Sequence, residues 1–123
     1  MVSINLVVLY CSNLEQSLSF YQALGLDFKE EQHENRPVYY SCLIGGILLN
    51  LCPLIEDPYP LVKDSTVIKR IPKDRIGLVV DNLDDILHKL GANVLSTKKD
   101  KIFGLRAILE DPDGRSIFLS ESK

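Results

Sequence analysis

The stretch LVVLYCSNLEQSLSFYQALG, residues 6–25, decides the fold of this 123-residue chain. It opens with an apolar run typical of a buried β-strand and continues into an amphipathic pattern. Ser12 and Glu15 have the spacing of a helix-capping box, and Gly25 follows as a stop signal. The apolar stripe of the helix consists of Leu14, Leu18, Tyr21 and Leu24. The stretch therefore predicts a strand that leads directly into a helix.

The same pattern occurs a second time later in the chain. Residues 6–15 align without gaps on residues 75–84, so an apolar strand again meets a helix cap. In this second copy Asp81 or Asn82 is the expected cap, and Gly91 is the expected end. The apolar stripe of the second, shorter helix consists of Leu83, Ile86, Leu87 and Leu90. The chain thus contains an internal repeat.

Each predicted helix is followed by segments with the composition of β-strands. They are residues 26–31, 38–44 and 47–52 after the first helix, and residues 94–97, 105–110 and 116–120 after the second. Gly45-Gly46 is a two-residue hairpin signal, and DPDG at 111–114 matches a type I turn. We therefore predict an α+β fold of two tandem βαβββ modules.

Length and proline content suggest how the chain is divided. A chain of 123 residues is long enough for one domain. Four prolines between the two copies predict a connector, either a lid or a crossover. We expect module one at about residues 1–52, the connector at about 53–72 and module two at about 73–123. Modules of this size bury too little surface to be stable alone, which favours a core shared with a second copy of the chain.

Composition excludes several classes of protein. The 14 Lys and Arg against 17 Asp and Glu give a net charge of −3 without a basic block, so no nucleic acid is expected as a partner. The most apolar region is interrupted by Gly and Pro and is too short to span a bilayer, so no membrane is expected either. The cysteines, Cys11, Cys42 and Cys52, lie in apolar stretches without CxxC spacing. This predicts reduced thiols and a cytoplasmic location.

The motif SNLEQSLSFY at residues 12–21, followed by Leu24-Gly25, resembles the opening of a vicinal-oxygen-chelate domain. This superfamily contains glyoxalase I, bleomycin-resistance proteins and extradiol dioxygenases. GLR at 104–106 and DPDG at 111–114 resemble its closing strands, and the duplication agrees. The resemblance implies a cupped mixed β-sheet with the helices outside and a ligand on the concave face. It leaves function open, because the superfamily hosts lyases, epimerases, oxygenases and binding proteins.

The resemblance also implies four positions at which catalytic members hold a divalent metal. They lie near the start of each module's first strand and in each module's last strand, and here they are Leu6, Asn50, Arg75 and Phe118. A divalent cation prefers imidazole, carboxylate or thiolate ligands. Leu6 and Phe118 supply no ligand atom, and Arg75 carries a positive charge. We therefore expect no metal and no other cofactor.

The two histidines do not replace the missing ligands. His33 lies in a charged hairpin tip, and His88 lies off the apolar stripe of the second helix, so both are expected at the surface. Asp111 and Asp113 fit the predicted turn better than a calcium loop. The chain contains no nucleophile elbow, Walker loop or GxGxxG motif, and no catalytic residue is assigned.

The remaining expectation is a small-molecule site on the predicted cup. The predicted ligand-binding residues are Leu6, Val8, Tyr40, Leu48, Asn50, Arg75, Arg106 and Phe118. Because Arg75 is a charged residue on an apolar strand, its guanidinium needs an anionic partner. The partner is either a carboxylate or phosphonate of the ligand or an internal acid such as Glu110 or Asp74. The same two alternatives apply to Arg106.

Three functions follow from these expectations. The first is a metal-independent small-molecule binding protein similar to the bleomycin-resistance branch, a homodimer whose groove holds an anionic or aromatic ligand. The second is a lyase or isomerase of the glyoxalase-like class, with an atypical metal site or with Arg75 as an electrostatic clamp. The third is a non-catalytic interaction module whose cup is filled by its own side chains.

Overall fold

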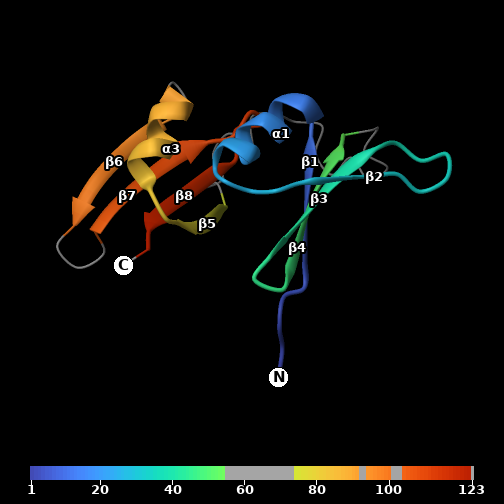
Figure 1. Cartoon of the computed structure of the whole chain (residues 1–123), viewed down its shortest axis with the longest axis horizontal. Coiled ribbons are helices and arrows are strands. Elements are labelled where there is room, and N and C mark those ends of the chain that lie inside the picture. Colours follow the sequence, from blue (N-terminus) through green and yellow to red (C-terminus); the bar gives the residue numbers. More distant parts are fainter. Residues whose placement is uncertain (55–73, 92–93, 101–103, 123) are drawn as a thin grey trace, which may run out of the picture.

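The computed structural model describes residues 1–54, 74–91, 94–100 and 104–122, and they form two βαβββ units (Figure 1). The first unit consists of β1 (Leu6–Cys11), α1 (Leu14–Ala23), β2 (Lys29–Glu31), β3 (Tyr39–Ile44) and β4 (Ile47–Pro53). The second consists of β5 (Arg75–Val80), α3 (Leu83–Leu90), β6 (Val94–Asp100), β7 (Gly104–Glu110) and β8 (Ser116–Glu121). The predicted α+β repeat is confirmed. From residue 55 onward, the predicted connector lies outside the described residues.

The two units have the same strand order and the same pairing. The first sheet has the order β1-β4-β3-β2 and the second β5-β8-β7-β6, and in each the first strand pairs in parallel with the last. Val8 lies opposite Asn50 in the first sheet, and Gly77 lies opposite Phe118 in the second. Because Val8 aligns with Gly77 in the repeat, Asn50 and Phe118 occupy equivalent positions.

Both helices begin at an asparagine. The Asn13 side chain accepts a hydrogen bond from the Gln16 backbone N–H at 3.1 Å, and Asn82 caps α3 in the same way. The expected cap at Ser12 was therefore wrong by one residue. Asparagine is among the best N-cap residues, and the Ser12 backbone N–H donates instead to the carboxylate of Asp113 at 3.0 Å.

One hydrophobic core joins the two units. The helices contact each other, and side chains from one face of each sheet pack around them. The core residues are Leu9, Cys11, Leu49 and Leu51 of the first sheet, Ala107, Leu109, Ile117 and Leu119 of the second, and Phe20, Tyr21, Leu24, Leu83, Ile86 and Leu90 of and beside the helices. Figure 1 shows α1 between the two sheets. The faces of the sheets that pack on the helices therefore contribute to the same interior, and the opposite faces point outward.

This arrangement differs from the single cup that the family resemblance implies. In the described part of the chain, the strands form two separate four-stranded sheets, with the helices meeting between them. Each helix still covers one face of its own sheet, as expected for a βαβββ module. The described strands of the two sheets do not pair with each other into one cup.

Several smaller expectations are confirmed. Gly45 and Gly46 adopt positive φ angles in the β3–β4 hairpin, and the Gly114 N–H closes the DPDG turn onto the Asp111 carbonyl at 2.9 Å. His33 and His88 are exposed. The three cysteines are free, and burial raises the pKa of each thiol. No helix in the ranges that the structure describes is long and apolar enough to cross a membrane.

Candidate functional site

Each sheet has a face that neither α1 nor α3 covers, and its residues alternate with the core residues along every strand. On the first sheet this face, here called the first outer face, contains Leu6, Val8 and Tyr10 of β1, Leu48, Asn50 and Cys52 of β4, Tyr39, Ser41 and Leu43 of β3, and Lys29 and Glu31 of β2. Exposure follows the alternation: Leu48 is 42% exposed, whereas its neighbour Leu49 is 6% exposed. The first outer face is therefore an apolar surface open to solvent.

The second outer face is built in the same way. It contains Arg75, Gly77 and Val79 of β5, Ser116, Phe118 and Ser120 of β8, and Arg106, Ile108 and Glu110 of β7. The Arg106 guanidinium carbon lies 5.6 Å from the centroid of the Phe118 ring, a cation–π distance. Arg75 is exposed at the start of β5, opposite Ser116, and makes no ion pair within the described residues.

The structure divides the predicted ligand-binding residues between these two faces. Leu6, Val8, Leu48 and Asn50 lie on the first outer face, and Arg75, Arg106 and Phe118 lie on the second. The two groups are not brought together within one chain, because the two outer faces point away from the shared core.

Tyr40 lies on the other side of the first sheet. Its ring packs against the core, and its hydroxyl lies 3.3 Å from Glu15 of α1 and 3.5 Å from Glu30. The reason is the pairing of Tyr40 with the buried Leu51, which gives Tyr40 the orientation of the core residues. Its neighbours in β3, Tyr39 and Ser41, take the outer positions, and only the β3–β4 register reveals this.

The four positions that correspond to metal ligands do not fit a divalent cation. Leu6 and Phe118 have no ligand atom, Arg75 is cationic, and Asn50 alone offers an oxygen. In the part of the chain that the structure describes, no group of three or more His, Cys, Asp or Glu side chains is suited to hold a metal ion. The donor chemistry of these positions therefore does not support metal catalysis of the family type.

A row of polar side chains crosses the first outer face. Ser41 lies opposite Asn50 in the β3–β4 ladder, and the Ser41 hydroxyl donates to Glu31 Oε1 at 3.4 Å. The Asn50 Oδ1 atom is buried and has no hydrogen-bond partner among the residues that the structure describes. At the edge of the row, His33 Nε2 and the Tyr39 hydroxyl lie 2.9 Å apart. The sequence analysis missed Ser41, Glu31 and Tyr39, because their common face depends on the strand register.

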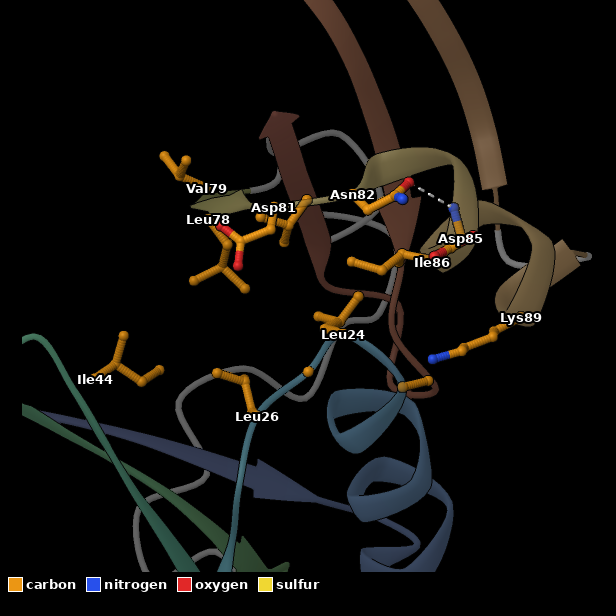
Figure 2. Close-up of a pocket in the computed structure, with 14 residues that line it drawn as sticks. Leu24, Leu26, Ile44, Leu78, Val79, Asp81, Asn82, Asp85, Ile86 and Lys89 are labelled. Atoms are coloured by element: carbon orange, nitrogen blue, oxygen red, sulfur yellow. Dashed lines mark hydrogen bonds between the residues drawn. The ribbon is translucent and has the colours of Figure 1, made fainter. Parts of the chain in front are cut away.

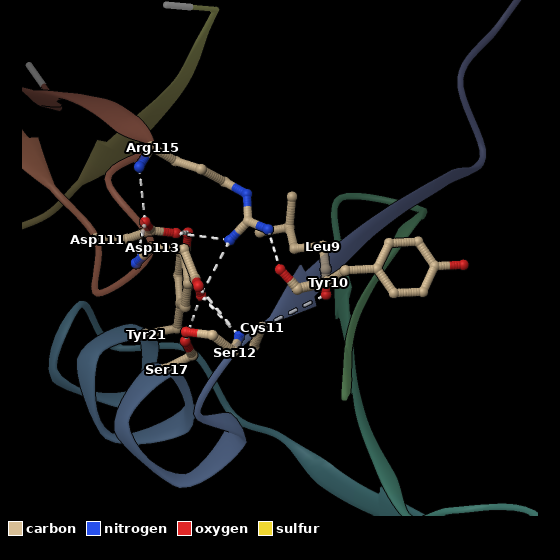
Figure 3. A network of polar contacts seen from close by, with 9 residues as sticks. All are labelled: Leu9, Tyr10, Cys11, Ser12, Ser17, Tyr21, Asp111, Asp113 and Arg115. Atoms are coloured by element: carbon tan, nitrogen blue, oxygen red, sulfur yellow. Dashed lines mark hydrogen bonds and ion pairs between the residues drawn. The ribbon is translucent and has the colours of Figure 1, made fainter. Parts of the chain in front are cut away.

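A buried network connects the two units on the core side (Figure 3). Asp111 accepts a hydrogen bond from the Tyr21 hydroxyl at 2.6 Å, and from the Arg115 backbone and guanidinium at 2.8 and 3.0 Å. Arg115 in turn donates to the carbonyl oxygen of Tyr10 at the end of β1. Burial, followed by the hydrogen bond to Asp111, raises the pKa of Tyr21. The network therefore holds α1 and β1 against the β7–β8 turn.

Asp113 adds a second set of contacts at the same junction. Its carboxylate accepts hydrogen bonds from the Ser12 backbone and from the Ser17 hydroxyl at 3.5 Å. Partial burial raises the pKa of Asp113, but the hydrogen bonds from Ser12 and the positive charge of Arg115 outweigh this effect and hold the pKa below its ordinary value. The DPDG turn thus fixes the two units relative to each other.

The cavity shown in Figure 2 borders the second outer face, because Gly77 and Val79 of β5 are among its lining residues. It has a volume of about 560 Å³ and lies between the end of α1, β5 and α3, with Leu24, Val80 and Ile86 among its apolar lining. The Lys89 side chain reaches from α3 toward the end of α1. Asn82 at its rim is already used as the α3 cap. None of the predicted ligand-binding residues lines this cavity.

Solved structures of similar fold agree with this architecture. Lactoylglutathione lyase from Agrobacterium tumefaciens is 15% identical with a TM-score of 0.60, and the match covers 98% of this chain and 93% of the lyase. A hypothetical protein from S. aureus is 19% identical with a TM-score of 0.68, covering 99% and 98%. A glyoxylase/bleomycin resistance protein/dioxygenase domain from Frankia sp. EAN1pec is 20% identical with a TM-score of 0.63, covering 100% and 99%. At these identities the similarity concerns the fold alone.

The family itself is shown by the sequence. No curated protein matches the chain. The model of the Glyoxalase/Bleomycin resistance protein/Dioxygenase superfamily matches residues 3–117, which is nearly the whole chain. The matched range contains the first βαβββ unit, the DPDG turn and the second unit up to the start of β8. The chain therefore belongs to the Glyoxalase/Bleomycin resistance protein/Dioxygenase superfamily.

Proposed function

We propose that this protein binds a small molecule without a metal ion, on the outer faces of its sheets. The supporting observation is that the four ligand positions carry Leu, Asn, Arg and Phe, on outer faces that also expose apolar side chains such as Val8 and Val79. An apolar surface with a few polar groups that orient a ligand is the usual composition of a small-molecule site. Arg75 and the Arg106–Phe118 pair supply positive charge and an aromatic surface, which suit an anionic or aromatic ligand.

In this proposal the binding site forms only in a homodimer, where the first outer face of one chain meets the second outer face of its partner. Large apolar side chains are exposed on both outer faces, including Tyr10 at 57%, Leu43 at 68% and Val79 at 70%. A single chain does not bury these faces against each other, because the Tyr21–Asp111–Arg115 network and the shared core hold them apart. A second copy that places its second outer face over the first outer face of its partner covers both and forms two equivalent grooves.

Light scattering coupled to size-exclusion chromatography tests the dimer. The expected mass at micromolar concentration is twice 13.9 kDa. Val8→Glu introduces a charge into the first outer face and is expected to shift the protein toward the monomer. Gln22→Glu, an exposed position on α1, is the matched control and is expected to leave the mass unchanged. A wild-type monomer under these conditions contradicts the dimer.

A thermal-shift screen tests ligand binding and the role of Arg75. The screen includes acidic aromatics, thiol conjugates and glycopeptide antibiotics, and a ligand at a hundred times its Kd stabilises the protein by about 2.7 kcal/mol. Arg75→Ala is expected to abolish the shift produced by anionic hits while leaving the melting temperature without ligand nearly unchanged, because Arg75 is exposed. A hit of the same size in this variant removes Arg75 as the anchor.

Titration with nickel or zinc separates the binding protein from the lyase or isomerase. Protein purified without chelators is expected to bind neither ion stoichiometrically, since the four positions lack imidazole and carboxylate ligands. Stoichiometric binding that Asn50→Leu abolishes contradicts the proposal and favours the enzyme.

A further inference from the structure

The polar row on the first outer face offers three hydrogen-bond acceptors, with Lys29 beside them as a donor. Asn50, Ser41 and Glu31 lie on the neighbouring strands β4, β3 and β2. The Ser41 hydroxyl directs its proton to Glu31, so the lone pairs of its oxygen remain available. Neighbouring strands are about 4.8 Å apart, which places the acceptors within the span of one small molecule.

Asn50 has an unmet need for a donor. Its Oδ1 atom has almost no contact with solvent and no hydrogen-bond partner in residues 1–54, 74–91, 94–100 and 104–122, which is unfavourable for a polar atom. The side chain as a whole is only half-buried. Because the terminal torsion of asparagine is broad, rotation of the amide can turn the oxygen toward Ser41, and the amide nitrogen then moves toward the place that the oxygen leaves. A ligand that supplies a donor there satisfies an acceptor that the chain leaves unpaired.

The second module shows that this row is not a general property of the fold. At the positions equivalent to Asn50 and Ser41, the second sheet carries Phe118 and Ile108, which are apolar. The repeat thus places acceptors at these positions of one outer face, and an aromatic ring and an aliphatic side chain at the equivalent positions of the other. A ligand that contacts both faces needs a polar end and an apolar or aromatic body.

The charges beside the row nearly cancel. Lys29 lies opposite Ser41, and Glu31 lies two residues further along β2 on the same face. His33 and Tyr39 are hydrogen-bonded to each other. The positive charge of Lys29 offsets the negative charge of Glu31, so the row does not favour a cationic ligand. It selects a neutral donor.

We infer that the first outer face binds ligands through a neutral hydrogen-bond donor, a hydroxyl or amide N–H, attached to an apolar or aromatic body. The donor meets Asn50 and Ser41, and the body lies on the neighbouring Leu6, Val8 and Leu48. This inference rests on the proposed function and names the ligand class of the same site.

A matched pair of probes isolates the donor. We compare 2-naphthylmethanol with its methyl ether, which keeps the ring and the oxygen but lacks the donor hydrogen, by isothermal titration calorimetry on the full chain. The alcohol is expected to bind roughly three- to tenfold more tightly, as one hydrogen bond contributes. In Asn50→Leu the preference is expected to fall to about one, with a melting temperature equal to or above the wild type, because an unsatisfied acceptor is removed.

Two further variants keep the result interpretable. Ser41→Ala is expected to reduce the preference in part. Leu48→Ala, on the same strand and face as Asn50, is expected to weaken both probes equally and to leave the preference unchanged. Binding of both probes with equal affinity, or unchanged preference in Asn50→Leu, overturns the inference alone. A more than tenfold preference for 2-naphthylmethylamine over the alcohol also overturns it. Failure of every probe to bind contradicts the proposed function as well.

Discussion

Asp111 is the residue on which the junction between the modules depends. It is 4% exposed and accepts hydrogen bonds from Tyr21 and from Arg115, which lie on different modules. A buried carboxylate is stable only when such partners surround it. The loss of a single donor therefore affects the whole junction.

Tyr21→Phe tests this dependence. Removal of the hydroxyl deprives Asp111 of its 2.6 Å hydrogen bond and is expected to lower the free energy of unfolding by about 2 kcal/mol. Tyr40→Phe is the matched control, because its hydroxyl lies in an exposed contact 3.3 Å from Glu15; a change within about 0.5 kcal/mol is expected. Urea unfolding measures both. Equal effects contradict a special role for Tyr21.

Asp113 predicts a pH dependence. Its folded-state pKa lies below the ordinary value of 3.8, so its ionised form stabilises the folded state fully above that value. This contribution is lost as the pH falls through the folded-state pKa. The stability difference between the wild type and Asp113→Asn is therefore expected to be constant at neutral pH and to shrink below about pH 4. Urea midpoints between pH 7 and pH 2.5 measure the difference. A gap that widens on acidification has the wrong sign.

The residues that cap the two ends of a helix determine where it begins and ends. The helix α3 has only 8 residues, too few for stability by propensity alone. Its start is fixed by Asn82, whose side chain accepts from the Asp85 backbone at 3.2 Å, and its end by Gly91 with a positive φ. Local side-chain chemistry and core packing together maintain this helix.

Asn82→Ala is expected to lower the free energy of unfolding by about 1 kcal/mol, because it leaves an N–H at the first turn without its acceptor. Asn82→Ser retains an acceptor and is expected to cost much less. Urea midpoints with an unchanged m-value report the difference. If the two variants are equally unstable, the cap is not the cause.

The helices and strands were easier to predict from the sequence than the contacts between them. The periodicities in residues 6–25 and 75–91 give both strand–helix units, because spacing within a segment reflects its own burial. The orientation of Tyr40 was missed because it depends on pairing with Leu51 in another strand. The Tyr21–Asp111 hydrogen bond joins residues 90 positions apart, and a contact of this kind cannot be predicted from a local sequence pattern. For the same reason the acceptor row on the first outer face required the structure.

At the scale of the whole molecule, the shared core makes the two modules mutually dependent. Phe20 and Tyr21 of the first module belong to the same cluster as Leu83 and Ile117 of the second. A chain of about 60 residues buries only a marginal fraction of its surface. We therefore expect neither module to retain its core when the other is absent.

A fragment of residues 1–54 tests this dependence. It contains the complete first sheet and α1 but lacks the half of the core supplied by the second module. We expect it to show no cooperative unfolding transition by circular dichroism and poor dispersion of amide signals by NMR. The full chain measured under the same conditions is the reference. A cooperative transition in the fragment contradicts mutual dependence.

The alternation of side chains along the strands separates two kinds of constraint within the same few residues. In β1, Leu9 and Cys11 face the interior, whereas Leu6, Val8 and Tyr10 face outward. Evolution or a protein engineer can therefore alter recognition by changing every second position of a strand while the intervening positions preserve folding. Randomised libraries confined to the outward positions of β1, β4 and β8 are expected to retain a large share of folded members with new binding preferences. The fold is in this sense a scaffold whose stability and selectivity are encoded in separate, interleaved sets of residues.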